Sequence, residues 1–161
     1  MISKYQNEKY SDEYWMAMAL SLARKAFDLK EVPVGCVIVA NNKIISKASN
    51  LKEKLQTPLA HAEVLAIHKA SKKRKSWRLE DCTLYVTLEP CPMCAGVILQ
   101  SRIKRVVFAS KDPKSGSVQS LYQLLSDKRL NHQVEISAGL LEEESTALLK
   151  LFFKQLRSRN I

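Results

Sequence analysis

Short runs of β-branched and apolar residues alternate with helix-patterned segments along the chain, and this alternation most constrains the fold. Strand-like runs occupy 34–40, 44–48, 83–88, 105–109 and 134–137. Helical patterns occupy 11–29, 60–75, 91–101, 118–125 and 142–157. The order predicts a three-layer α/β/α sandwich, in which a central mixed sheet of about five strands has helices on both faces. No repeat or linker interrupts the 161 residues, so 1–161 is expected to form a single domain.

Basic residues outnumber acidic ones by 26 to 16, which gives a formal net charge of +10. The basic residues are spread over the whole chain and recur in its last helical segment, 142–157. Such a charge favours a polyanionic partner, and nucleic acid is expected ahead of a membrane surface.

Several classes of protein are excluded by what the chain lacks. Only four glycines occur, and no dinucleotide-binding or P-loop pattern is present, so no nucleotide cofactor is expected. The apolar run 14–23 follows Asp12 and Glu13, where a signal peptide would carry positive charge. No apolar run approaches the ~18 residues that a membrane span needs. A cytoplasmic protein that is not embedded in a membrane is therefore expected.

Two cysteines, Cys91 and Cys94, lie in a stretch whose spacing predicts both thiols on one face of the first turn of a helix. Pro90 ends the preceding strand, and Pro92 suits an early helical position. Thiolates at a helix N-terminus can hold a soft divalent metal such as zinc. On this motif alone, a redox pair or half of a structural Cys₄ zinc site is favoured over a catalytic zinc site.

Further ligands must decide between these alternatives, and the candidates are His61, His68, His132, Cys36 and Cys82. A strand separates Cys82 from Cys91, and His68 lies about 10 Å beyond His61 along a helix. One histidine with two cysteines leaves a position open, as catalytic zinc sites do. His61 is the best candidate, because His61-Ala-Glu63 opens one helix as the cysteines open the next. Glu63 would then lie beside the metal without binding it.

With these residues, the chain resembles the zinc-dependent nucleobase deaminases, whose motifs are His-x-Glu and Pro-Cys-x-x-Cys. Within this cytidine/deoxycytidylate deaminase superfamily it is most similar to the bacterial tRNA-specific adenosine deaminases. The similarity runs from about Glu31 to Arg157. It is carried by Val32–Gly35, Asn50, Ala60–Glu63, Leu84–Gly96, Ser101–Ile103, Arg105–Phe108, Lys111–Lys114, Gly116, Asn131–His132 and Phe152–Phe153.

The resemblance implies a function and a set of site residues. It implies a zinc-dependent hydrolase with one Zn²⁺ per subunit, ligated by His61, Cys91 and Cys94, with Glu63 as the proton shuttle. Asn50 would donate a hydrogen bond to the flipped base. The substrate site would further include Val34, Ala62 and Leu88.

The resemblance also implies the substrate and the partners. The expected reaction converts adenosine to inosine at the wobble position (34) of the anticodon of an arginine tRNA (ACG), with release of ammonia. The expected partners are the tRNA anticodon stem-loop and a second copy of the chain in a homodimer. The residues expected to contact the tRNA are Asp112, Lys114, Ser115, Phe153, Lys154 and Arg157.

Two other functions compete with this one. A free guanine or cytosine deaminase would use the same zinc centre, but the charge of +10 argues against it because a free base has no phosphates. A noncatalytic zinc-binding nucleic-acid module, or an inactive subunit of a deaminase pair, would not need Glu63. Phe152 and Phe153 lie ~100° apart on a helix, so one can pack while the other faces RNA, and the sequence leaves open which one does.

Overall fold

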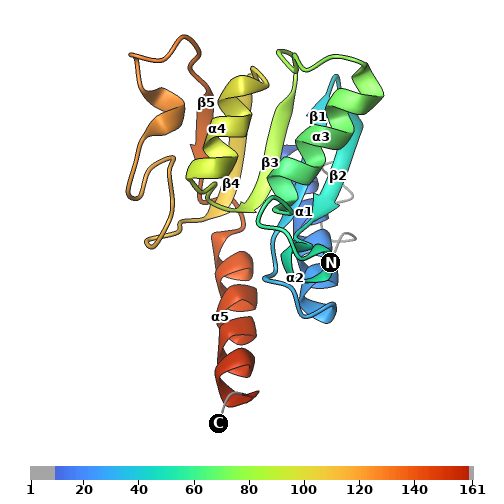
Figure 1. The fold of residues 1–161 in the computed structure, drawn as a ribbon, viewed down its shortest axis with the longest axis vertical. Helices are drawn as coiled ribbons and strands as arrows, with labels where there is room; N and C mark the ends of the chain where they lie inside the picture. Colours follow the sequence, from blue (N-terminus) through green and yellow to red (C-terminus); the bar gives the residue numbers. More distant parts are fainter. Residues whose placement is uncertain (1–9, 160–161) are drawn as a thin grey trace.

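The chain forms a five-stranded sheet in the computed structural model, which describes residues 10–159 (Figure 1). Across the sheet the strands follow the order β2-β1-β3-β4-β5. Their bounds are β1 Gly35–Ala40, β2 Lys43–Ser49, β3 Thr83–Leu88, β4 Arg105–Ser110 and β5 Glu135–Ala138. Residues 1–9 and 160–161, the ends of the expected domain, lie outside the described residues.

The sheet is mixed because it begins with a hairpin. β1 is antiparallel to both β2 and β3, whereas β3, β4 and β5 are parallel to one another. Asn41 and Asn42 make the hairpin turn, both with positive φ, which asparagine tolerates better than most residues. As a result, the start of β1 lies at the same edge of the sheet as the carboxyl ends of β3 and β4.

Helices cover both faces of the sheet, as the alternation predicted. Their bounds are α1 Asp12–Asp28, α2 Lys52–Leu55, α3 Ala62–Arg74, α4 Pro92–Gln100 and α5 Glu142–Arg159, with the 3-10 helix η2 Leu124–Ser126. Because successive strand residues point to opposite faces, Val37 joins Trp15 of α1 in one core cluster and Ile38 joins Ala66 of α3 in the other. α3 and α4 lie on one face, with α1 behind the sheet on the other (Figure 1).

α5 begins at the carboxyl ends of β3 and β4 and then extends beyond the sheet (Figure 1). The Ser145 hydroxyl donates to the carbonyl oxygen of Thr87 at 2.5 Å. The hydroxyls of Ser110 and Thr146 lie 2.9 Å apart and share a hydrogen bond. These contacts fix the start of α5 beside the edge of the sheet where β1 begins.

The expected strands and four of the five expected helices are confirmed to within one or two residues at most ends. The helix expected over 118–125 is wrong: this segment forms turns, and only Leu124–Ser126 is helical, as η2. The backbone N–H groups of Val118, Gln119 and Ser120 donate to the carboxylate of Glu89, so a side chain far away in sequence determines this backbone. The short helix α2 was not expected.

Among residues 10–159, no helix combines the length and the apolarity that crossing a bilayer requires.

β1 packs closely on α1 at Gly35. A Cβ atom built there would overlap the carbonyl oxygen of Ala19 and crowd the backbone nitrogen of Ala23. We therefore expect Gly35→Ala to destabilise the fold by about 1–3 kcal/mol, as overpacking does. The loss would appear in thermal unfolding as a Tm lowered by about 2–4 °C for each kcal/mol.

Gly96→Ala is the matched control, because a Cβ at Gly96 of α4 meets no atom within 4 Å. Alanine in a helix interior is favoured over glycine by about 0.5–1 kcal/mol, so this variant is expected to unfold at or slightly above the wild-type Tm. An unchanged Tm for Gly35→Ala would contradict the close packing of α1 on β1.

Candidate metal centre and substrate pocket

His61, Cys91 and Cys94 converge at the edge of the sheet where β3 ends. Their ligand atoms all lie within 4.8 Å of one another. His61 Nδ1 is 3.7 Å from Cys91 Sγ and 3.5 Å from Cys94 Sγ. This is the only such group of His, Cys, Asp or Glu side chains within residues 10–159 that could hold a metal ion.

Two helix N-termini bring these ligands together. His61 is the N-cap residue of α3, and Cys91 is the N-cap residue of α4. Pro92, at the first position of α4, supplies a preset φ and lacks an N–H that would otherwise go unpaired. Cys94 follows one turn later, so its thiol faces the same side as that of Cys91. The sequence had predicted this meeting of two helix starts.

The two thiols differ strongly in acidity. Hydrogen bonds from Cys94 and from His61 lower the pKa of Cys91 to about 4. The hydrogen bond to Cys91 and burial both raise the pKa of Cys94 well above its ordinary value. Cys91 is thus the more acidic thiol of the pair, at the positive end of the α4 dipole, which favours anions.

The geometry of the group fits zinc. Zn–S and Zn–N bonds of about 2.3 and 2.0–2.1 Å in a tetrahedron place sulfur and nitrogen ligands about 3.6 Å apart. The observed separations of 3.5 and 3.7 Å match this value. Three protein ligands leave the fourth position for water or substrate, which is the pattern of catalytic rather than structural zinc sites.

Glu63, in the first turn of α3, is buried beside this group. Only 4% of the residue is exposed, and burial raises the pKa of its carboxyl group to about 7. It is not one of the three side chains that could together hold a metal ion, so its role beside the metal stays a prediction.

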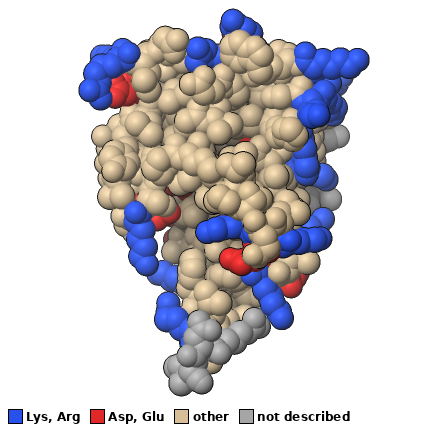
Figure 2. Space-filling model, viewed as in Figure 1, with Lys and Arg blue, Asp and Glu red and all other residues tan. Residues whose placement is uncertain are grey.

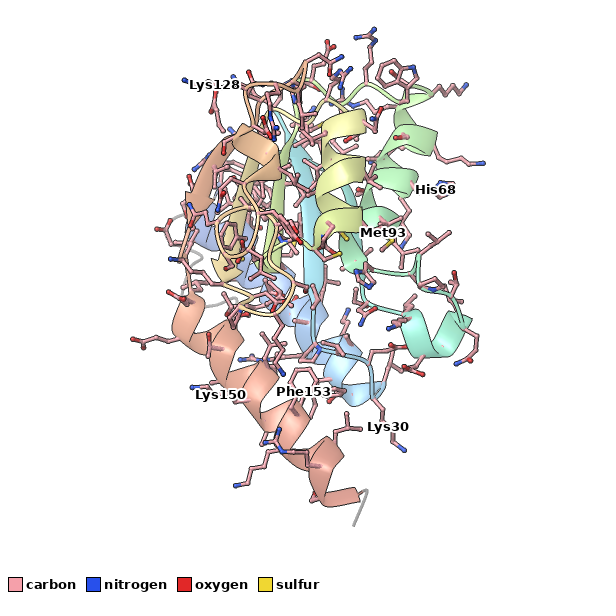
Figure 3. All side chains as sticks on the ribbon, turned by 60° about the vertical axis from the view of Figure 1, so that its left-hand side comes forward. Lys30, His68, Met93, Lys128, Lys150 and Phe153 are labelled. Atoms are coloured by element: carbon pink, nitrogen blue, oxygen red, sulfur yellow. The ribbon has the colours of Figure 1, made fainter. Side chains whose placement is uncertain are left out.

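The other candidate ligands lie outside the metal group. Cys36 and Cys82 are fully buried core residues. His132 Nε2 lies 2.8 Å from the carbonyl oxygen of Ile103, and His68 is exposed on the outer side of α3 (Figure 3). The choice of one histidine and two cysteines is therefore supported by the geometry.

A pocket of about 160 Å³ opens over the metal group and Glu63. All four residues expected at the substrate site, Asn50, Val34, Ala62 and Leu88, line it. The Asn50 side chain is oriented by two contacts: its Oδ1 accepts from the backbone N–H of Lys52, and its Nδ2 donates to the carbonyl oxygen of Val32, both at 3.2 Å. Because the amide nitrogen carries two hydrogens, Asn50 can donate a second one.

A groove of about 870 Å³ adjoins the pocket and shares Val32, Leu88, Asp112 and Ser115 with it. The segment after β4 forms one wall and α5 the other. The structure brings all six residues expected to contact tRNA into this lining: Asp112, Lys114, Ser115, Phe153, Lys154 and Arg157.

The structure resolves the choice between the adjacent phenylalanines. Phe152 is 8% exposed and packs edge-on against Phe27, with ring centroids 5.9 Å apart. Phe153 is 41% exposed, lines the groove, and is labelled on α5 in Figure 3. Phe153 is therefore the ring that is open to a ligand.

The sequence did not identify Val32, Lys52 and Glu89 as site residues, although they also line the pocket. The position of Glu89, directly before Pro90 and the metal ligand Cys91, was an available signal for it. Lys52 lies in α2, a helix too short to produce a periodic pattern.

The matching family model, described as MafB19-like deaminase, covers residues 10–157. The chain is 50% identical over 148 residues to the tRNA-specific adenosine deaminase of Bacillus subtilis (strain 168), covering 92% of each chain. It is 48% identical over 149 residues to that of Aquifex aeolicus (strain VF5), covering 92% of this chain and 98% of the relative.

A solved structure from a study of A-to-I editing by tRNA:A34 deaminases at the wobble position of transfer RNA has a similar fold. It superposes with a TM-score of 0.81 at 38% identity, over 84% of this chain and 99% of the other. Fold, metal group and sequence thus define a deaminase. The chain belongs to the MafB19-like deaminase family and, within it, to the tRNA-specific adenosine deaminases.

The metal group gives a direct prediction for zinc content. We expect Cys94→Ser to lower zinc affinity by more than about 100-fold, because even substitutions of residues behind the ligands cost about 10–100-fold. Cys82→Ser makes the same chemical change outside the group and should keep stoichiometric zinc. Elemental analysis of the purified variants, before and after competition with a chelator, measures both. Equal zinc retention in the two variants would contradict the proposed ligand set.

Proposed function

We propose that the chain is a zinc-dependent tRNA adenosine deaminase that converts adenosine 34 of the anticodon to inosine, with an arginine tRNA (ACG) as the substrate. One observation carries the proposal: an open His-Cys-Cys metal group and a buried glutamate share a base-sized pocket that continues into a basic groove. The close similarity to tRNA-specific adenosine deaminases over about nine-tenths of the chain supports the substrate class.

The proposed chemistry needs a proton carrier beside the reacting atoms. A zinc ion bound by His61, Cys91 and Cys94 would lower the pKa of a water molecule, so that its oxygen can add to C6 of adenine at neutral pH. Glu63 would take the proton of this water and deliver it to N1. It would then assist the departure of the amino group as ammonia, leaving oxygen on C6. A single buried carboxylate that lies beside both the water molecule and N1 can accept a proton from one and donate it to the other.

The remaining pocket residues would hold the flipped base. Val34, Ala62 and Leu88 offer apolar contacts that exclude water from the reacting carbon. Asn50, with its oxygen turned toward the N–H of Lys52, presents its amide nitrogen as a donor to an acceptor on the base. A purine has such acceptors at its ring nitrogens.

The groove would hold the nucleotides that flank the target. It combines the exposed ring of Phe153 with Lys111, Lys114, Lys150, Lys154 and Arg157. Stacking on an aromatic ring and ion pairs with phosphates are the usual means of holding single-stranded nucleic acid. Figure 2 shows Lys and Arg side chains on both sides of the lower end of the molecule, where α5 lies.

The proposal includes a homodimer in the cytoplasm. Leu121, Tyr122 and Leu130 are each more than 40% exposed in the single chain and offer apolar surface to a second copy. Light scattering of the zinc-loaded protein measures the oligomeric state.

The decisive experiment measures inosine in an arginine tRNA with an ACG anticodon. Purified zinc-loaded wild type should form inosine at the wobble position, and Glu63→Gln should be at least about 100-fold slower while keeping its zinc, because glutamine cannot carry the proton. Glu80→Gln, the same change on an exposed residue before β3, should match wild type.

Free guanine, cytosine and adenosine belong in the same assay. Ammonia from guanine or cytosine, without inosine in tRNA, would favour the small-molecule deaminase. Zinc binding with no deamination of any substrate would favour the noncatalytic module.

Lys154 provides a test of the RNA-binding groove. We expect Lys154→Ala to weaken binding of an anticodon stem-loop and to reduce the slope of log affinity against log salt by about 0.7, the loss of one phosphate contact to a single strand. Lys128→Ala removes another exposed lysine, at the end of the molecule opposite Lys150 and Phe153 of α5, and should change neither quantity (Figure 3). Fluorescence anisotropy over a series of KCl concentrations measures both. An unchanged slope for Lys154→Ala would place the RNA elsewhere.

A further inference from the structure

The segment 111–120, which follows β4, forms a wall common to the pocket and the groove. Asp112 and Ser115 line both of them, whereas Lys111, Pro113 and Lys114 line the groove alone. The segment contains turns but no helix or strand. Its shape must therefore come from contacts outside regular secondary structure.

Those contacts converge on the carboxylate of Glu89, which is only 2% exposed. One oxygen accepts from the backbone N–H groups of Val118 at 3.1 Å, Gln119 at 2.7 Å and Ser120 at 2.9 Å. The other oxygen accepts from the backbone N–H of Asp112 at 2.9 Å and from the hydroxyl of Ser120. All five donors belong to segment 111–120, so the segment wraps around a single charged group.

Gly116 shows how closely the segment wraps. A Cβ atom at this position would overlap the Glu89 carboxylate and the carbonyl oxygen of Asp112. The N–H of Gly116 donates to that carbonyl oxygen at 2.8 Å, and the N–H of Ser117 donates to the carbonyl oxygen of Pro90 at 2.9 Å. A residue with a side chain at 116 would therefore push the carboxylate and the segment apart.

Asp112 connects Glu89 to the groove through hydrogen bonds. Its N–H is held by Glu89, and its own carboxylate accepts from the backbone N–H of Lys114 at 2.9 Å and from that of Ser115 at 3.3 Å. It also accepts from the Ser115 hydroxyl at 2.7 Å. The placement of Lys114 in the groove, and of Ser115 where the groove meets the pocket, thus depends on Glu89 through Asp112.

We propose that Glu89 is a positioning residue for RNA: through segment 111–120 it determines how tightly the nucleotides beside the target base are held, and it takes no part in proton transfer or metal binding. The inference rests on the proposed function. It assigns a role to a carboxylate that is two residues from Cys91 and whose hydrogen bonds all go to segment 111–120.

Steady-state kinetics of zinc-loaded Glu89→Gln on an anticodon stem-loop test this inference. Glutamine keeps the shape but turns an N–H₂ group toward backbone donors, and it removes the charge that strengthens five hydrogen bonds. KM for the stem-loop is expected to rise by about 10–100-fold, while kcat falls by less than about threefold and zinc stays stoichiometric.

Gly116→Ala disturbs the contact between Glu89 and segment 111–120 from the side of the segment, because the added Cβ atom would overlap the carboxylate. It should raise KM in the same way, and the double variant should lie within about threefold of the more affected single variant, because both changes break one interaction. If the increases in KM of the two single variants multiply in the double variant, Glu89 does not act through segment 111–120.

Asp12→Asn is the matched control for lost stability. Asp12 accepts from Tyr85 Oη at 2.7 Å and from both terminal nitrogens of Arg105 at 2.9 and 2.7 Å, beside the amino ends of β3 and β4. Its substitution breaks a comparable carboxylate network far from the site. It should lower the Tm and leave KM unchanged.

Two outcomes would overturn the inference while the proposed function stands. In Glu89→Gln, loss of zinc would show that Glu89 supports the metal, and an unchanged KM with a lowered Tm would show a role in stability alone. A wild-type protein that forms no inosine in tRNA or in the stem-loop would instead refute the proposed function, and the inference with it.

Discussion

The site depends on the sharp turn between β3 and α4. Pro90 ends the strand, Cys91 caps the helix, and Pro92 starts the helix with its φ preset. Because α3 begins at the same edge of the sheet, His61 meets the two thiols at 3.5 and 3.7 Å, and the positive ends of two helix dipoles face one metal position. Glu89, directly before Pro90, holds segment 111–120 with its carboxylate. One tight connection therefore positions both the metal group and the wall of the RNA groove.

Most of the fold could be predicted because its signals are local. Alternating apolar residues mark the strands, and periodic apolar residues with acidic starts mark α1 and α5, so expected and observed ends differ by a residue or two. The two errors have non-local causes. Segment 118–125 contains apolar residues at helical spacing, but its N–H groups bond to Glu89 instead. α2 is four residues long, and its N–H groups at Glu53 and Lys54 are held by the buried carboxylate of Glu31.

Part of the metal group could be predicted for a similar reason: the three-residue spacing of Cys91 and Cys94 at a helix start places both thiols on one face. His61 and Glu63 were predicted because they open the neighbouring helix and match the family motif, although His61 lies 30 residues before Cys91. The role of Glu89 could not be predicted, because its hydrogen-bond partners lie 23 to 31 residues further along the chain. A glutamate in a sequence carries no sign of whether it will be solvated or enclosed by backbone donors.

The enclosure of Glu89 also limits how such an enzyme can change during evolution. An insertion or deletion within 112–120 would break hydrogen bonds between the backbone N–H groups of this loop and the buried carboxylate of Glu89. Exchange of side chains that face outward, at Lys111, Pro113 and Lys114, leaves these hydrogen bonds intact. Substitutions at these positions can therefore change substrate preference while the length of segment 111–120 stays the same. The neighbouring metal group is not altered by them.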